Sequence, residues 1–171
     1  MLLSTALGYA VHVPPQHLDT VVFERTLEQA HDLADQGQTT AARTAVDRAL
    51  ALWRGHPFAE LRGHPAAQQG TVYLEELRRT AYDLRARLLL AENRPVQAVL
   101  AAEQLVADSP FRETAWVTLL KALCAAGRSA EALGRYETIR HLLADALGTS
   151  PGPELQRVHL AVLRHTWAGQ R

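Results

Sequence analysis

A helical hairpin is encoded in the stretch Trp116-Val-Thr-Leu-Leu-Lys-Ala-Leu-Cys-Ala-Ala-Gly-Arg-Ser-Ala-Glu-Ala-Leu-Gly-Arg-Tyr136. Before Gly127, large apolar residues recur at the three- and four-residue spacing that places them on one face of a helix. After it, Ala132 and Tyr136 are again four residues apart. Because glycine often ends helices, the stretch predicts two helices joined by a tight turn.

The same arrangement recurs around two other turn residues, Gly37 and Asn93. Each turn residue is preceded by an apolar helix and followed five residues later by alanine. Asn93 and Gly127 are 34 residues apart, which is the period of tetratricopeptide repeats. Gly37 and Asn93 are 56 residues apart, and the additional 22 residues begin near Trp53-Arg-Gly-His-Pro-Phe58. Since such hairpins must stack to bury their apolar faces, we expect an all-α fold of tetratricopeptide-like hairpin repeats with about seven helices.

Capping residues, prolines and glycines predict where the helices begin and end. We expect helices at about 19–36, 39–53, 65–92, 95–107, 111–126 and 129–147, and a last one from about 153 onward. Gly70 weakens the early part of the third helix, so Thr71 is an alternative start. Asp19 and Ser129 are expected to be N-caps, and Gly148 is expected to end the sixth helix. The proline-rich segment after Gly148 is expected to fold the last helix back across the third hairpin.

The first residues follow a different pattern. Leu7-Gly-Tyr-Ala-Val-His-Val13 alternates and is followed by Pro14-Pro15, which predicts a single β-strand. A lone strand leaves backbone groups unpaired, which is costly. We therefore expect this strand to be the remnant of an element that lies outside the chain.

Composition and charge exclude several classes of protein. The 18 basic and 18 acidic side chains cancel, so no net field draws the chain to nucleic acid or to an anionic membrane. Cys124 is the only cysteine, which excludes an internal disulfide and is typical of a reducing compartment. The sequence predicts no membrane span and no signal peptide, and we expect a cytoplasmic protein.

No motif predicts catalysis. The histidines lack the i,i+4 spacing of a helical metal pair, and the serines do not lie in a nucleophile elbow. Gly148-Thr-Ser-Pro-Gly152 lacks the lysine of a phosphate-binding loop. Glu75 and Glu76 are adjacent on a predicted helix and therefore point apart. We expect a protein that is not an enzyme and that holds no metal and no cofactor.

Four sequence blocks carry a family resemblance. They are Leu52-Trp-Arg-Gly-His-Pro-Phe58, Leu74-Glu-Glu-Leu-Arg78, Gly127-Arg-Ser-Ala-Glu-Ala-Leu133 with Tyr136, and Ala146-Leu-Gly-Thr-Ser-Pro-Gly-Pro-Glu-Leu155. In this order they resemble the bacterial transcriptional activator domain of the Streptomyces antibiotic regulatory protein family. The resemblance extends from about residue 8 to residue 163, nearly the whole chain.

The resemblance implies a division of the chain and a function. Residues 1–15 would be the remnant of the C-terminal strand and linker of an OmpR-like winged-helix domain, and residues 16–171 the activator domain. The DNA-recognition helix would lie outside the chain. The module would regulate transcription of antibiotic biosynthesis genes through protein contacts with RNA polymerase or with its own partner domains, with a homodimer as a further possibility and no membrane partner.

By analogy with tetratricopeptide grooves, the first helices of successive hairpins are expected to form a partner-binding groove. The expected residues are Glu24, Leu27 and His31 in the first hairpin, Asp83 and Arg87 in the second, and Val117 and Lys121 in the third. Charges of both signs favour a peptide or protein surface over a polyanion. The alternative is that these side chains only solvate an exposed face.

Two further alternatives stay open. Trp53 and Phe58 either anchor a partner, as exposed aromatic residues do, or pack the inserted segment against the hairpins. The whole chain is either the regulatory module described above or a free-standing tetratricopeptide-like adaptor that binds a peptide. In the regulatory module the first strand would pair with residues upstream of Met1, whereas in the adaptor it would be disordered or paired within the domain.

Overall fold

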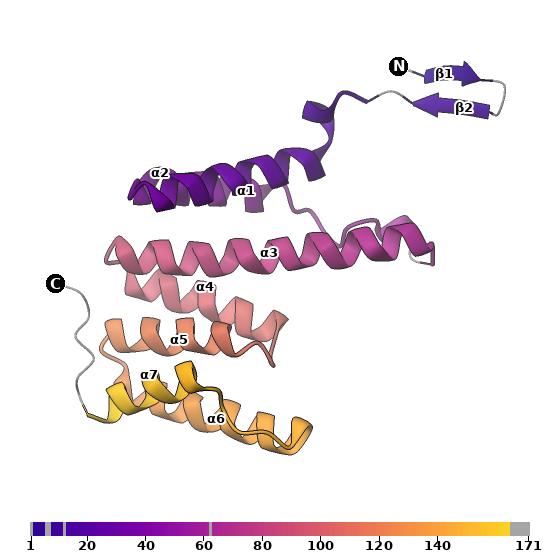
Figure 1. Ribbon diagram of the computed structural model, residues 1–171. Helices are drawn as coiled ribbons and strands as arrows, with labels where there is room; N and C mark the ends of the chain where they lie inside the picture. The colour runs from indigo at the N-terminus through magenta and orange to yellow at the C-terminus, as the bar shows by residue number, and fades with distance from the viewer. Residues whose placement is uncertain (1, 6–7, 12, 62, 165–171) are drawn as a thin grey trace. The chain divides into compact units, whose positions relative to one another are not determined.

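The computed structural model describes residues 2–5, 8–11, 13–61 and 63–164. The chain divides into two compact units, Met1–Leu77 and Arg78–Arg171, and each is described by itself. Seven α-helices make up most of the described residues, and a short strand pair precedes them (Figure 1). The predicted all-α class of tetratricopeptide-like hairpins is confirmed.

The helices lie close to their predicted ranges. The first unit contains the 3-10 turns η1 (Pro15–His17) and η2 (Ala59–Leu61), the helices α1 (Asp19–Asp35) and α2 (Thr39–Ala51), and the first part of α3 (Pro65–Ala91). The second unit contains the remainder of α3, followed by α4 (Pro95–Asp108), α5 (Glu113–Ala125), α6 (Ser129–Leu147) and α7 (Pro153–Leu163).

Two predicted N-caps are wrong by one residue. Asp19 and Ser129 are the first residues of α1 and α6, whereas the N-caps are Leu18 and Arg128, and neither makes a side-chain cap hydrogen bond. In both helices the carbonyl of the N-cap residue already accepts the first backbone hydrogen bond of the helix. The predicted end at Gly148 is confirmed, since this residue is the left-handed C-cap of α6.

The three hairpin turns share one backbone geometry. Gly37, Asn93 and Gly127 have φ angles of 74°, 56° and 74°, in the left-handed region that glycine adopts freely and asparagine tolerates. The N–H of the following residue donates to the carbonyl five residues earlier in each turn, at 2.9, 2.8 and 2.8 Å. This is the Schellman arrangement of a helix C-terminus. The recurring turn residues therefore encode one recurring turn conformation.

The N-terminal strand is paired, contrary to the prediction of a lone strand. Strand β1 (Leu2–Thr5) pairs antiparallel with β2 (Gly8–Val11), with Leu2 opposite Val11 and Thr5 opposite Gly8. Backbone groups that were expected to lack partners are thus hydrogen-bonded within the chain. Pairing with residues upstream of Met1 is not needed to satisfy this edge of the strand.

The predicted strand was also longer than β2. Leu7 and His12, which the prediction included, lie outside the described residues, and Val13 follows the strand. Pro14 and Pro15 then lead into η1 and α1. The strand thus ends before the proline pair, and neither proline has to donate to the strand ladder.

The first unit is built on the packing of α1 against α2, which run side by side in Figure 1. From α1, Phe23, Leu27 and Ala30 are buried. From α2, the buried residues are three alanines and one valine: Ala42, Ala45, Val46 and Ala49. Small side chains on one helix let the two backbones approach closely, while the large side chains of the other fill the remaining space.

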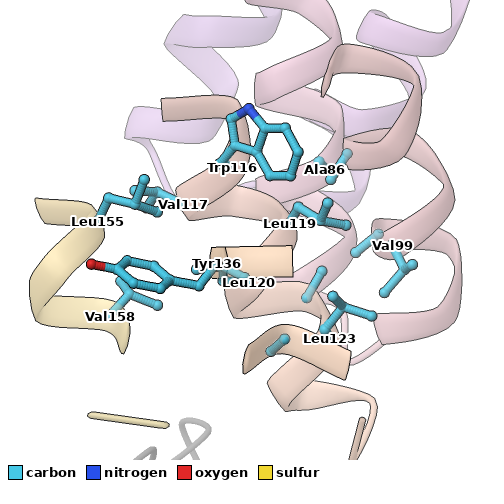
Figure 2. Close-up of a cluster of buried hydrophobic side chains, with 14 of the residues drawn as sticks. Ala86, Val99, Trp116, Val117, Leu119, Leu120, Leu123, Tyr136, Leu155 and Val158 are labelled. Carbon is cyan, nitrogen blue, oxygen red and sulfur yellow. The ribbon is translucent and has the colours of Figure 1, made fainter. Parts of the chain in front are cut away.

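The largest hydrophobic cluster lies in the second unit and is centred on α5 (Figure 2). Trp116, Leu119, Leu120 and Leu123 are at most 3% exposed. Side chains from the last turns of α3 and from α4, α6 and α7 complete the cluster. The indole N–H of Trp116 donates to the carbonyl of Pro110 at 2.8 Å, which satisfies the one polar group of a buried tryptophan.

Helix α7 folds back onto the third hairpin, as predicted. It packs against both α5 and α6 and buries Leu155, Val158 and Val162. The backbone N–H of Gly152, its N-cap residue, donates to a carboxylate oxygen of Glu113 at 2.6 Å. A charge-assisted hydrogen bond of this kind is stronger than a neutral one, so it fixes the start of α7 against the start of α5.

The close packing around Ala132 predicts the effect of a larger side chain. Ala132 is 1% exposed, so Ala132→Leu should lower the free energy of unfolding by about 1–3 kcal/mol through overpacking. Ala125→Leu is the control, because Ala125 is exposed at the end of α5. Urea unfolding followed by circular dichroism measures both. Equal midpoints for the two variants would contradict the close approach of helices at Ala132.

Candidate partner-binding surface

Three of the predicted groove residues lie on α1 in the first unit. Glu24 and His31 are half-buried, so part of each side chain is accessible to a partner. Leu27 is 3% exposed and belongs to the core of this unit. The expectation that Leu27 lines an open groove is therefore wrong, because a side chain enclosed by its own unit has no surface to offer.

A second predicted groove residue is also buried. Val117 is 4% exposed and belongs to the same hydrophobic cluster as Leu155 of α7 (Figure 2). By analogy with tetratricopeptide grooves, the Val117 side of α5 was expected to be accessible to a partner. In the structure, α7 packs against α5. Val117 is thus a core residue and not a contact residue.

The other three predicted residues lie in a row of polar contacts across the second unit. On α3, the Arg87 guanidinium lies 3.0 Å from one carboxylate oxygen of Asp83. The second carboxylate oxygen of Asp83 accepts a hydrogen bond from the Thr118 hydroxyl on α5 at 2.9 Å. One turn further along α5, the Lys121 ammonium lies 3.4 Å from the Glu154 carboxylate on α7.

These five residues, Asp83, Arg87, Thr118, Lys121 and Glu154, form what we call the polar row. Thr118 and Lys121 are three residues apart on α5 and so lie on the same face of the helix. The row therefore continues from α3 across α5 to α7, and it presents both charges at its surface.

Sequence reasoning missed two members of the polar row, Thr118 and Glu154. A signal for both was present in the repeat period. Thr118 follows Asp83 by 35 residues, and Glu154 follows Lys121 by 33. Both separations are close to the 34 residues between Asn93 and Gly127, and residues one period apart occupy equivalent positions on successive hairpins.

The ion pairs of the polar row are accessible to solvent. The side chains of Arg87 and Glu154 are 56% and 55% exposed, and that of Lys121 is 36% exposed. Exposed pairs of this kind contribute about 0–1 kcal/mol to folding. Arg87, Lys121 and Glu154 can therefore exchange their present partners for charges on another molecule at little cost to the fold.

The inserted segment packs against its own unit, as one of the two alternatives expected. The Trp53 ring meets the Phe23 ring edge-on, with centroids 5.4 Å apart and planes at 84°, and so packs the insert against α1. Phe58 is 41% exposed, as an anchor for a partner would be. Its ring also lies against α3, because a Cβ atom built on Gly70 would come within 2.8 Å of it.

In the described part of the chain, metal-ligating side chains do not gather into a metal site. No group of three or more His, Cys, Asp or Glu side chains there could hold a metal ion. Cys124 is half-buried, and burial raises the pKa of its thiol, with a smaller opposing effect from a hydrogen bond with Ser129. The described residues also contain no helix that is long and apolar enough to cross a membrane.

Comparison with known families gives one match along the helical region. The family model described as the bacterial transcriptional activator domain matches residues 18–163. The regulatory protein AfsR of Streptomyces griseus is 34% identical over 163 residues, which are 95% of this chain and 17% of AfsR. The transcriptional regulator RedD of Streptomyces coelicolor is 31% identical over 95% of this chain and 46% of RedD.

A solved structure has the same fold. The structure of Mycobacterium tuberculosis EmbR in complex with a low-affinity phosphopeptide superposes with a TM-score of 0.87 at 28% identity, over 96% of this chain and 43% of that one. EmbR itself is a transcriptional regulatory protein. The chain spans less than half the length of AfsR, RedD and EmbR.

The hydrogen bond from Thr118 on α5 to Asp83 on α3 should stabilise the second unit. Thr118→Val keeps the shape of the side chain but removes the hydroxyl that Asp83 accepts from, so the free energy of unfolding should fall by about 1 kcal/mol. Thr138→Val is the matched control, because the Thr138 hydroxyl is exposed and donates to the Gly134 carbonyl of its own helix. Chemical denaturation measures both. A loss no larger in Thr118→Val than in the control would argue against the bond.

The raised pKa of Cys124 predicts how the thiol titrates. The folded thiol loses its proton at higher pH than the unfolded thiol. The rate of its reaction with 5,5′-dithiobis(2-nitrobenzoate) should therefore rise with pH, with an inflection at higher pH than in the unfolded chain. The same titration in denaturing urea supplies the reference. The pH of the inflection is the quantity to compare. Restricted access of the reagent to the thiol lowers the rate at every pH but does not change the pH of the inflection. An inflection at or below the reference contradicts the prediction.

Proposed function

This chain belongs to the bacterial transcriptional activator domain family, and on that basis we propose that it is the activator and oligomerisation module of a regulator of antibiotic or other secondary-metabolite genes. It acts in the cytoplasm through protein contacts, either with RNA polymerase or with its own partner domains. Sequence-specific DNA binding is supplied by a winged-helix domain outside these 171 residues.

The observation that carries this proposal is the extent of the family match. Residues 18–163 include α1 through α7, so the match covers the whole helical array and not a single hairpin. AfsR, RedD and EmbR are regulators, which supports a role in transcription and not in catalysis. The link to antibiotic genes rests on the four sequence blocks described above, and two of these relatives come from Streptomyces.

The polar row supports a protein partner. Its surface alternates between the positive ends of Arg87 and Lys121 and the carboxylates of Asp83 and Glu154. Alternating charges select a partner whose own charges are arranged to match, whereas a nucleic acid backbone needs a uniformly positive surface. Of the predicted groove residues, Asp83, Arg87 and Lys121 are therefore retained as partner contacts, and Glu24 and His31 are retained for the first unit.

A free-standing peptide-binding adaptor is the second candidate. The observation in its favour is the pairing of β2 with β1 inside the chain, which the adaptor hypothesis expected. An adaptor of this kind would bind its peptide without any effect on a promoter. Activation of a promoter therefore distinguishes the two candidates.

The activator proposal predicts recruitment of RNA polymerase. The chain is fused to an unrelated DNA-binding domain, and reporter expression and co-purification of polymerase are measured. Charge reversal by Arg87→Glu or Lys121→Glu should lower activation about tenfold, the equivalent of about 1.4 kcal/mol of binding free energy. Arg140→Glu is the control, because Arg140 is similarly exposed but pairs with Glu137 on its own helix α6.

The outcomes separate the candidates. Activation that falls in the two polar-row variants and persists in Arg140→Glu supports the proposed contacts. Equal activation in all four proteins rejects the polar row as the contact surface. No activation by a fusion that circular dichroism shows to be folded rejects the contact with polymerase and leaves an oligomerisation module or the adaptor.

A further inference from the structure

The inserted segment after α2 lines a cavity in the first unit. The cavity has a volume of about 400 Å³ and is widely open to solvent. Its walls include Phe23 of α1, Trp53 and Phe58 of the insert, and Leu74 of α3. None of the residues that line it belongs to the polar row, so the proposed contact with polymerase leaves this cavity without a role.

Aromatic rings shape the cavity. The edge-to-face contact between Phe23 and Trp53 fixes the tryptophan ring, and Leu74 is 5% exposed. The Trp53 ring is half-buried and Phe58 is exposed, so both have surface that can meet another aromatic ring in an offset-stacked or perpendicular arrangement. The walls are therefore suited to a flat aromatic molecule.

Phe58 is held in a strained conformation at the mouth of the cavity. Its φ of 52° lies in the left-handed region, which is unfavourable for a bulky residue. The ring is nevertheless 41% exposed, so burial of the side chain does not repay the strain in full. Strained residues of this kind concentrate at ligand-binding positions. The absence of a side chain at Gly70 lets the ring lie close to α3.

Two polar pairs lie at the cavity. Arg54 and Asp19 both line it, and their charged groups are 3.2 Å apart, so they offset each other's charge. His56, which also lines the cavity, contacts the Glu75 carboxylate at 3.3 Å. The apolar walls themselves offer no counter-charge. A full charge placed among them would lose its hydration, which is costly.

We infer that this cavity is a binding site for a small, uncharged, flat aromatic molecule of two or three rings. Its volume lies in the range of small-molecule sites, about 300–1,000 Å³, and is much larger than one aromatic side chain needs. The accessible parts of Trp53 and Phe58 supply most of the binding free energy through burial of the ring surface. The Asp19–Arg54 pair at the rim is available for a hydrogen bond to one polar group of the ligand.

A pair of fluorescent probes tests the inference directly. N-phenyl-1-naphthylamine is uncharged and brightens in apolar sites, and 1-anilinonaphthalene-8-sulfonate is the same molecule with one sulfonate. Titration of the 171-residue chain with each probe yields a stoichiometry and a Kd. We expect one site, with the uncharged probe bound at least tenfold more tightly. Equal or tighter binding of the sulfonate overturns the assignment to an uncharged ligand, and absence of binding by both overturns the site.

Three variants locate the binding. Phe58→Ala removes one wall and should weaken binding of the uncharged probe at least tenfold. Gly70→Ala leaves all the wall residues in place but should displace the Phe58 ring and weaken binding as well, while alanine favours the helix over glycine. Phe111→Ala is the control, because Phe111 is an exposed aromatic residue of the second unit that does not line the cavity.

The result that overturns the location is equal binding by Phe58→Ala and Phe111→Ala in chains with unchanged helical content. Because the Gly70→Ala variant retains every aromatic side chain, unchanged binding by that variant would also place the probe elsewhere. The measurement uses no promoter and no polymerase, so its failure leaves the proposed activator role untouched, and failure of recruitment leaves this site untouched.

Discussion

The packing within each unit depends on one backbone constraint, the reversal of the chain through a left-handed residue at every hairpin turn. At Gly37, Asn93 and Gly127 the same φ region and the same backbone hydrogen bond end the first helix. The second helix then starts in a fixed register. This register brings small residues such as Ala42 and Ala132 into the core, where both are at most 1% exposed. A different turn would present another helix face and leave these apolar stripes in water.

Much of the fold could be predicted because its determinants are local. Turn residues and apolar periodicity predict seven helices, α3 to α6 begin and end within about two residues of expectation, and α7 begins where it was expected. The lone strand was wrong because pairing depends on a partner segment, and Leu2–Thr5 is too short to carry a strong pattern of its own. The misplaced N-caps at Asp19 and Ser129 have another cause: backbone hydrogen bonds set these helix starts, and capping side chains do not.

The candidate sites could be predicted only in part, because exposure depends on which elements pack together. Leu27 and Val117 occupy positions that a repeat groove would expose, yet packing within their own units buries both. The analogy with tetratricopeptide grooves pointed to Asp83, Arg87 and Lys121 but not to Thr118 and Glu154, which complete the polar row. The cavity beside Trp53 was harder still to foresee. Its mouth depends on the φ angle of Phe58, and no local sequence pattern predicts a left-handed phenylalanine.

The contacts of the polar row restrict where the chain can gain or lose residues. Asp83 meets Thr118 across 35 residues, and Lys121 meets Glu154 across 33. Each added or deleted residue within an intervening helix rotates the following side chains by about 100° and moves the partner off the shared face. Within this unit, changes in length are therefore confined to the turns between helices. Homologues that diverge in sequence can keep the same surface only if they keep the number of residues within these helices.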